Sequence, residues 1–136
     1  MATFKSIIME AVAKLKSVPM STRKMKLVVD LIRGKEVEDA LDILRFTNKE
    51  AALWIEKGLL SAVANWEHKL DGRESADDYD LHVKTIFSGQ GAQMKRFRPA
   101  PHGRAHRIRK HSCHVTIVVE NRVELPAEYT EEAIEA

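Results

Sequence analysis

The stretch from residue 81 to residue 119 contains no Asp or Glu, although the whole chain of 136 residues carries 20 acidic side chains. It contains eight Lys and Arg, and seven of them lie between Lys95 and Lys110. Positive charges that crowd together repel one another and destabilise a compact state. The missing acids exclude neutralisation within the stretch. They favour a polyanionic partner, for which the phosphate backbone of nucleic acid is the first candidate.

Cysteine and long apolar runs are also scarce. Cys113 is the only cysteine, which excludes a disulfide within the chain and is compatible with a reducing cytosol. No stretch approaches about 20 consecutive apolar residues, so we expect no membrane-spanning helix. The first 16 residues have no apolar run of the signal-peptide type. We therefore expect a cytoplasmic protein with no membrane partner.

The charges that are present are segregated along the chain. Residues 1–80 hold 13 basic and 14 acidic side chains, and residues 120–136 hold one basic and six acidic side chains. The formal net charge of +2 hides this distribution, which itself favours a nucleic-acid partner. A length of 136 residues with 44% hydrophobic residues fits a single domain with one core.

Hydrophobic periodicity predicts an α+β fold that begins with a strand over residues 10–18. Helices are expected over residues 22–33, 37–45 and about 47–68. Ser21 is the expected N-cap of the first helix, and Gly34 suits its C′ position. Thr47 and Glu50 form the S/T-x-x-E pattern of a capping box, which predicts where the third helix begins.

Apolar side chains at helical spacing indicate which helix faces are buried. In the first helix they are Met25, Val28, Val29 and Ile32. Gly58, in the middle of the third helix, costs up to about 1 kcal/mol relative to alanine. A close approach of that helix to a neighbouring helix or sheet would explain it. The acidic segment 71–80 predicts a surface loop.

Two alternating segments predict further strands over residues 81–87 and 113–119. The first is expected to present Leu81, Val83, Thr85 and Phe87 on one face. The second places Cys113 with inward Val and Ile side chains, so we expect a buried hydrophobe and not a nucleophile. Four histidines lie near it among cations, a poor setting for a zinc site, and we expect no metal and no cofactor. These are His102, His106, His111 and His114.

The two strands can pair as an antiparallel hairpin whose far end carries the basic segment. Leu81 would face Val119 and Phe87 would face Cys113, and this register puts the reversal at residue 100, between two prolines. About a dozen residues per strand, at ~3.3 Å each, would then project about 40 Å. Because a two-stranded ribbon alone is marginal in water, its partner must supply much of its order.

Arg side chains on such an arm present planar donor forks to phosphate oxygens. Phe97 can stack on a base or pack on a sugar. At the predicted start of the first helix, Ser21 lies beside Arg23 and Lys24, where backbone N–H groups can meet a phosphate.

Several segments together resemble the L-twenty-two family of large-subunit ribosomal proteins, in its bacterial form. They are LVVDLIRGK, ILRFTNKEAA and the basic KRFRPAPHGRAHRIRK with the HVTIVV that follows, and the likeness spans residues 10–119. The resemblance implies a β-α-α-α-β-β domain with three helices packed on a small three-stranded antiparallel sheet and a long protruding β-hairpin arm. It also implies a ribosome-bound, non-enzymatic protein that binds large-subunit rRNA and aids assembly. Neighbouring large-subunit ribosomal proteins would be its partners, and its arm would line the exit tunnel beside the nascent peptide.

The resemblance also suggests a division of the chain. Residues 1–9 would be an N-terminal extension, residues 10–120 the ribosomal-protein domain with its arm at 88–112, and residues 121–136 a disordered acidic tail. The residues expected to bind rRNA are Ser21, Arg23, Lys24, Lys26, Arg33, Lys84, Lys95, Arg96, Phe97, Arg98, His102, Gly103, Arg104, His106, Arg107, Arg109, Lys110 and His111. The expected exit-tunnel tip comprises Arg98, Pro99, Ala100, Pro101, His102, Gly103 and Arg104.

Two other classes of protein remain as alternatives. A free-standing regulatory module could use the basic hairpin as a ribbon that reads a nucleic-acid groove. An enzyme that uses histidine and Cys113 would need an acid–base pair, which the basic segment lacks because it contains no carboxylate.

Overall fold

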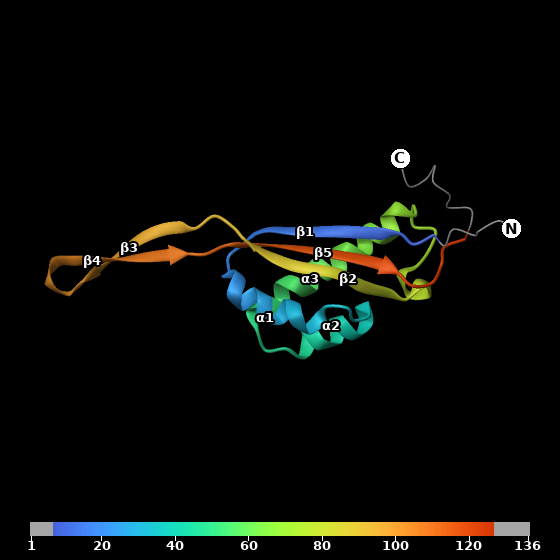
Figure 1. The fold of residues 1–136 in the computed structure, drawn as a ribbon, viewed down its shortest axis with the longest axis horizontal. Helices are drawn as coiled ribbons and strands as arrows, with labels where there is room; N and C mark the ends of the chain where they lie inside the picture. Colours follow the sequence, from blue (N-terminus) through green and yellow to red (C-terminus); the bar gives the residue numbers. More distant parts are fainter. Residues whose placement is uncertain (1–6, 127–136) are drawn as a thin grey trace.

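The computed structural model of the chain describes residues 7–126 and shows a compact part from which a narrow ribbon projects at one end (Figure 1). The elements follow in the order β1 (Glu10–Val18), α1 (Thr22–Ile32), α2 (Val37–Phe46), α3 (Glu50–Lys69), β2 (Leu81–Gln90), β3 (Met94–Ala100), β4 (Arg104–Lys110) and β5 (Cys113–Asn121), with the 3-10 turns η1 (Ala76–Tyr79) and η2 (Pro101–Gly103). The expected N-terminal extension and acidic tail lie mostly outside the described residues. Within residues 7–126, no helix has the length and apolar character needed to cross a membrane.

The compact part is a three-stranded antiparallel sheet with three helices on one of its faces (Figure 1). The strand order is β1-β5-β2, so the last strand of the chain is the central one. Helix α3 packs along β1 and β5, and α1 packs on β2. The expected α+β fold, with three helices on a small antiparallel sheet and a protruding hairpin, is confirmed.

The core lies between the sheet and the helices, as the apolar spacing predicts. All four expected inward side chains of α1 are fully buried, namely Met25, Val28, Val29 and Ile32. From α3, Trp66 is 0% exposed, and its ring N–H donates to the carbonyl oxygen of Met9 over 3.3 Å. Gly34 follows α1 with a φ of +76°, a left-handed conformation that suits glycine at the C′ position.

Gly58 faces the sheet at a point where α3 packs closely on it. A Cβ atom placed there would lie 2.9 Å from Cδ1 of Ile117 and 2.9 Å from Cδ1 of Leu15. The absence of a side chain therefore leaves room for these two side chains of β5 and β1. The expected close approach is confirmed, and its partner is the sheet.

The predicted capping box at the start of α3 is wrong. The N-cap is Lys49, and no side chain caps the helix. The hydroxyl of Thr47 donates instead to the carbonyl oxygen of Ile43, at 2.6 Å, and the N–H of Thr47 donates to Leu44. Thr47 thus ends α2, because the turn between the two helices is too short for it to serve both.

The predicted strand register is also wrong: the pairing is offset by two residues at the start of β2, and a bulge then shifts it further. Leu81 pairs with Asn121 and not with Val119, and the register shifts between Val83 and Thr85. The extra residue, Lys84, reverses the alternation that follows it.

Beyond the bulge, the inward position passes to Ile86, which is 1% exposed, while Thr85 and Phe87 face solvent. Cys113 consequently pairs with Gln90, and Phe87 pairs with Thr116.

The acidic segment 71–80 is not a purely exposed loop. It contains the 3-10 turn η1, whose Ala76 and Tyr79 are buried. The ring of Tyr79 lies 5.5 Å from that of Trp66, so the segment closes one end of the core. Acidic neighbours hide this role in the sequence, since the two apolar residues stand three positions apart in a polar run.

Candidate nucleic-acid interface

The projecting ribbon, Met94–Lys110, is a two-stranded sheet of its own (Figure 1). Its strands β3 and β4 have seven residues each and pair without interruption from Met94↔Lys110 to Ala100↔Arg104. At ~3.3 Å per residue, each strand spans about 23 Å. Apart from two half-buried apolar side chains, the ribbon faces solvent along its whole length. It has no hydrophobic core of its own to hold it.

The ribbon reverses at His102, two residues beyond the predicted position. Pro99 lies inside β3 and pairs with Ala105, while Pro101 begins the turn η2. His102 has a φ of +63° and Gly103 one of +67°, so the reversal depends on two successive left-handed residues. The position of such a turn depends on a residue pair that can adopt positive φ. The prolines alone therefore predicted the wrong position for the reversal.

Alternation along the strands places cations on both faces of the ribbon. One face carries Lys95, Phe97 and Pro99 from β3 and Ala105, Arg107 and Arg109 from β4. The other face carries Met94, Arg96, Arg98 and Ala100 from β3 and Arg104, His106, Ile108 and Lys110 from β4. A ribbon that is positive on both faces suits a position between two segments of a polyanion.

The seven cations of the ribbon have no anionic partners within residues 7–126. None of them takes part in an ion pair, and all are exposed. Lys95 lies directly across from Arg109 in the ladder. Like charges that face each other across strands destabilise a sheet. The ribbon therefore has a repulsion that an external anion would relieve.

Phe97 lies in the middle of this positive surface and is 74% exposed. Its ladder partner is Arg107, and it shares its face with Lys95 and Pro99. An exposed aromatic ring flanked by cations can stack on a base while its neighbours bind phosphate.

The root of the ribbon is held by three residues that form a clasp. The N–H of Gly91 donates to the carbonyl oxygen of Ser112 at 2.8 Å. The hydroxyl of Ser112 donates to the carbonyl oxygen of Ala92 at 2.6 Å. A Cβ atom on Gly91 would lie 2.6 Å from the hydroxyl oxygen of Ser112. Glycine at this position is what lets the two chains of the root touch.

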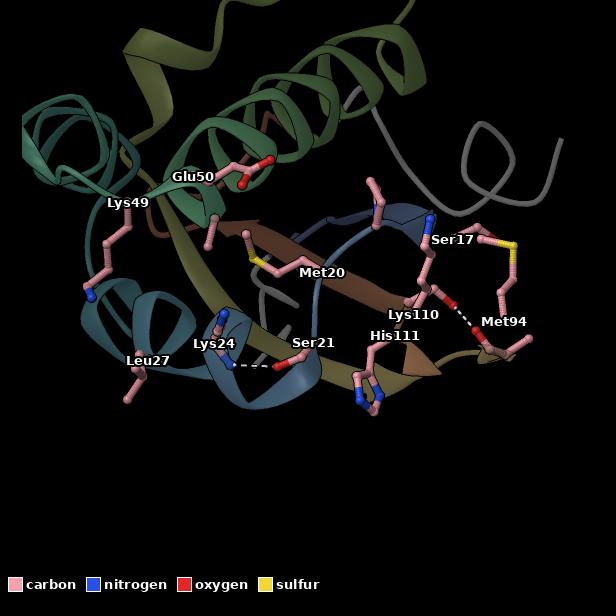
Figure 2. A pocket seen from close by; sticks show the side chains of 14 residues that line it. Ser17, Met20, Ser21, Lys24, Leu27, Lys49, Glu50, Met94, Lys110 and His111 are labelled. Carbon is pink, nitrogen blue, oxygen red and sulfur yellow. Dashed lines mark hydrogen bonds between the residues drawn. The ribbon is translucent and has the colours of Figure 1, made fainter. Parts of the chain in front are cut away.

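The start of α1 lies next to this root. The hydroxyl of Ser21 accepts from the N–H of Lys24 at 3.5 Å, so the predicted N-cap is confirmed. Figure 2 shows that Ser21 and Lys24 lie across a hollow from Lys110 and His111. The structure thus brings together predicted site residues from α1 and from the arm.

Two other predicted site residues already have partners inside the domain. Arg33 donates to Asp30 at 2.8 Å and to the carbonyl oxygen of Ile86 at 3.1 Å. Lys84 pairs with Glu10 and Glu120, and its hydrogen bonds to these carboxylates raise the pKa of its ammonium group. Arg33 thus links α1 to β2, and Lys84 links β2 to β5 and β1. An rRNA contact by either residue stays a prediction.

Cys113 lies on the sheet under the helices and is fully buried. Burial in apolar surroundings raises the pKa of its thiol, which keeps it protonated and unreactive. The expectation of a buried small hydrophobe is confirmed.

Sequence reasoning missed several residues beside the root. Met20, Leu27, Lys49 and Met94 line the same hollow as Ser21 and Lys24 (Figure 2). They come from four separate segments, and no local pattern signals that the segments meet.

The fold and this surface together define a class of protein: a small α+β domain that carries a cationic two-stranded arm. The profile of the family described as "Ribosomal protein L22p/L17e" matches residues 13–120. The chain belongs to this family.

Individual proteins with similar sequences support the same family membership. The chain is 54% identical over 110 residues to the large ribosomal subunit protein uL22 of Bacteroides fragilis, across 81% of this chain and 79% of the relative. It is 56% identical over 109 residues to the protein of the same name from Flavobacterium johnsoniae, across 80% of this chain and 79% of the relative. The Porphyromonas gingivalis protein of that name is 54% identical over 108 residues, across 79% of each chain.

Proposed function

We propose that this protein is a non-catalytic constituent of the large ribosomal subunit that binds large-subunit rRNA, aids subunit assembly and lines the nascent-peptide exit tunnel with its arm. The proposal rests most heavily on one observation, the unpaired positive charge of the ribbon. Seven exposed cations without a carboxylate partner in residues 7–126 call for an external polyanion. Membership in the family, and the names of the relatives, support large-subunit rRNA as that polyanion.

The arm contacts would divide by chemistry. Arg and Lys side chains on both faces would neutralise phosphates, and the Arg forks would donate to them in pairs. Phe97 would stack on a base or pack against a sugar. The start of α1, at Ser21 and Lys24, would bind a phosphate near the root of the arm. The remaining members of the predicted site are Arg23, Lys26, Arg33, Lys84, His102, Gly103, His106 and His111.

The tip, residues 98–104, would form part of the tunnel wall. It is the part of the described chain that lies farthest from the core in Figure 1. Its backbone is constrained by two prolines and by the left-handed pair His102 and Gly103. A stiff tip of this kind can hold a fixed position beside a passing peptide.

Capture from cell lysate separates the proposal from a free-standing regulator. The tagged protein should co-purify with large-subunit rRNA and proteins, and ribonuclease treatment should release both. Recovery of a discrete short duplex in their place would favour the regulatory module.

Salt titration of rRNA binding tests the role of the phosphates. Each phosphate that the arm neutralises releases counterions, so affinity should fall steeply as salt rises, with a slope of about 0.7 per contact on single strands. Changing Arg96, Arg98 and Arg104 together to Gln should weaken binding and flatten the slope. An affinity that stays constant between low and physiological salt would contradict a binding mode led by phosphate.

Site-specific cross-linking tests the tunnel position. A photoreactive group attached to the cysteine of His102→Cys should cross-link to the nascent chain in stalled ribosomes. The native Cys113 is buried, so the label should attach at position 102 alone in this protein. The same group on Leu31→Cys, an exposed position of α1 away from the ribbon, is the control. A nascent chain linked equally well to both positions would argue against a tip in the tunnel wall.

A further inference from the structure

A groove of about 980 Å³ lies where the arm joins the domain (Figure 2). Its walls come from the start of α1, the start of α3 and the two chains of the arm root. This size is within the range of sites that hold small molecules or single building blocks of a polymer. Its lining includes the clasp residues Ala92 and Ser112 and the ribbon residues Met94 and Lys110.

Charge around the groove is strongly one-sided. Lys24, Lys49 and Lys110 line it, with Glu50 as the single carboxylate. The three ammonium groups are exposed and have no ion-pair partner among residues 7–126. Three cations from three different segments therefore line one hollow.

Apolar side chains line the space between these cations. They are Pro19, Met20, Leu27, Ala51, Ala92 and Met94. Leu27 is 60% exposed and Met94 is 54% exposed, so neither is used by the core. A single exposed apolar side chain needs no explanation, but here two of them share one hollow with three lysines. A ligand that is both flat and apolar and also anionic would satisfy both kinds of wall.

We propose that this groove holds one unstacked nucleotide of single-stranded rRNA, an inference that rests on the proposed function. Its base would lie between Met20 and Leu27, with Met94 at the other end of the groove (Figure 2), and the adjoining phosphates would meet the ammonium groups. Lys110 belongs both to the groove and to the ribbon, so an RNA strand bound along the arm passes the mouth of the groove. An acidic peptide would also find the lysines, but the continuity with the ribbon favours RNA.

Two matched pairs of variants test the groove with transcribed large-subunit rRNA as the probe. Leu27→Ser removes an apolar wall, and Leu31→Ser makes the same change one turn further along α1, outside the groove. Lys49→Gln removes a groove cation, and Lys57→Gln removes an exposed cation elsewhere on α3. We expect each groove variant to weaken binding about fivefold or more, and each control to bind within about twofold of the wild type.

Cross-linking identifies what occupies the groove. A photoreactive group on Leu27→Cys in assembled subunits should link to an unpaired nucleotide, which reverse transcription can map. A link to a neighbouring ribosomal protein, or to a base-paired helix, would overturn the inference.

The outcomes separate the groove from the wider proposal. Absence of salt-dependent rRNA binding by the wild type would remove the proposed function, and the groove inference with it. Normal wild-type binding together with equal affinities for the groove variants and their controls would overturn only the nucleotide in the groove.

Discussion

The compact part and the ribbon of this protein are both built from antiparallel strands, yet different forces hold them. In the compact part, each strand turns one face to the helices, and Val83, Val115, Ile117 and Val119 are fully buried there. In the ribbon, no side chain from Met94 to Lys110 is fully buried. Backbone hydrogen bonds are common to both parts, so the difference lies in apolar burial, the dominant favourable term in folding.

The sequence of the compact part supplies the apolar side chains that stabilise it, whereas the sequence of the ribbon favours binding to a partner. The compact part has its own core, whereas the ribbon has charge that repels itself. We expect a region of this second kind to gain part of its order from its partner, as a segment that orders on binding does. The two parts should therefore respond differently to substitutions of similar size.

The largest contrast is expected between two aromatic truncations. Trp66→Ala removes a fully buried ring and a hydrogen bond to Met9, so we expect it to lower the free energy of unfolding by about 3–5 kcal/mol. Phe97→Ala removes a ring that is mostly exposed, and we expect a change within about 0.5 kcal/mol. Urea denaturation followed by circular dichroism measures both. Equal losses from the two substitutions would mean that the ribbon shares the core's stability.

A smaller loss is expected where α3 touches the sheet. Gly58→Ala would ordinarily stabilise a helix by up to about 1 kcal/mol. Here the new Cβ would lie 2.9 Å from both Ile117 and Leu15, so we expect a net destabilisation of about 1–3 kcal/mol. Ser61→Ala, on the exposed side of the same helix, is the matched control and should be neutral or slightly stabilising. A Gly58→Ala protein that melts higher than the wild type would show that the helix can move away from the sheet at no cost.

Regular periodicity allowed much of the compact part to be predicted. The bounds of β1, the N-cap Ser21 and the buried stripe of α1 follow from local pattern, because each depends on neighbours in sequence. The cation-rich stretch without Asp or Glu likewise predicted the arm. Periodicity also predicted the order of the elements, and the family resemblance implied the same order.

The errors fall where contacts that the local pattern does not reveal decide the outcome. The bulge at Lys84 depends on how β2 and β5 pack, and alternation within β2 alone cannot reveal it. Thr47 satisfies the capping-box pattern, but the end of α2 claims its hydroxyl. The groove brings together Leu27, Lys49 and Met94, whose positions in the chain are too far apart for any sequence window to join them.

A local effect is expected at the clasp between the two parts. Gly91→Ala would press a methyl group against the hydroxyl and backbone of Ser112, so the root must open and the ribbon should change direction. Because few core contacts are involved, the free energy of unfolding should fall by only about 0.5–1 kcal/mol, while amide chemical shifts change along the ribbon. Gly89→Ala, two residues earlier and with open space around it, should leave both unchanged. If the amide chemical shifts of the ribbon were identical in the two variants, the clasp would not determine the direction of the ribbon.

The smallest effect on stability is expected from removing most of the ribbon. Replacing Arg98–His106 with Asn-Gly joins Phe97 to its ladder partner Arg107 through a favourable hairpin turn. No buried side chain is lost, so the free energy of unfolding of the compact part, measured by thermal denaturation, should stay within about 0.5 kcal/mol of the wild-type value. Two of the ribbon's seven cations, Arg98 and Arg104, are lost with the segment, so rRNA affinity should fall with a shallower salt dependence. Loss of the cooperative unfolding transition in the shortened protein would contradict the claim that the compact part folds without the ribbon.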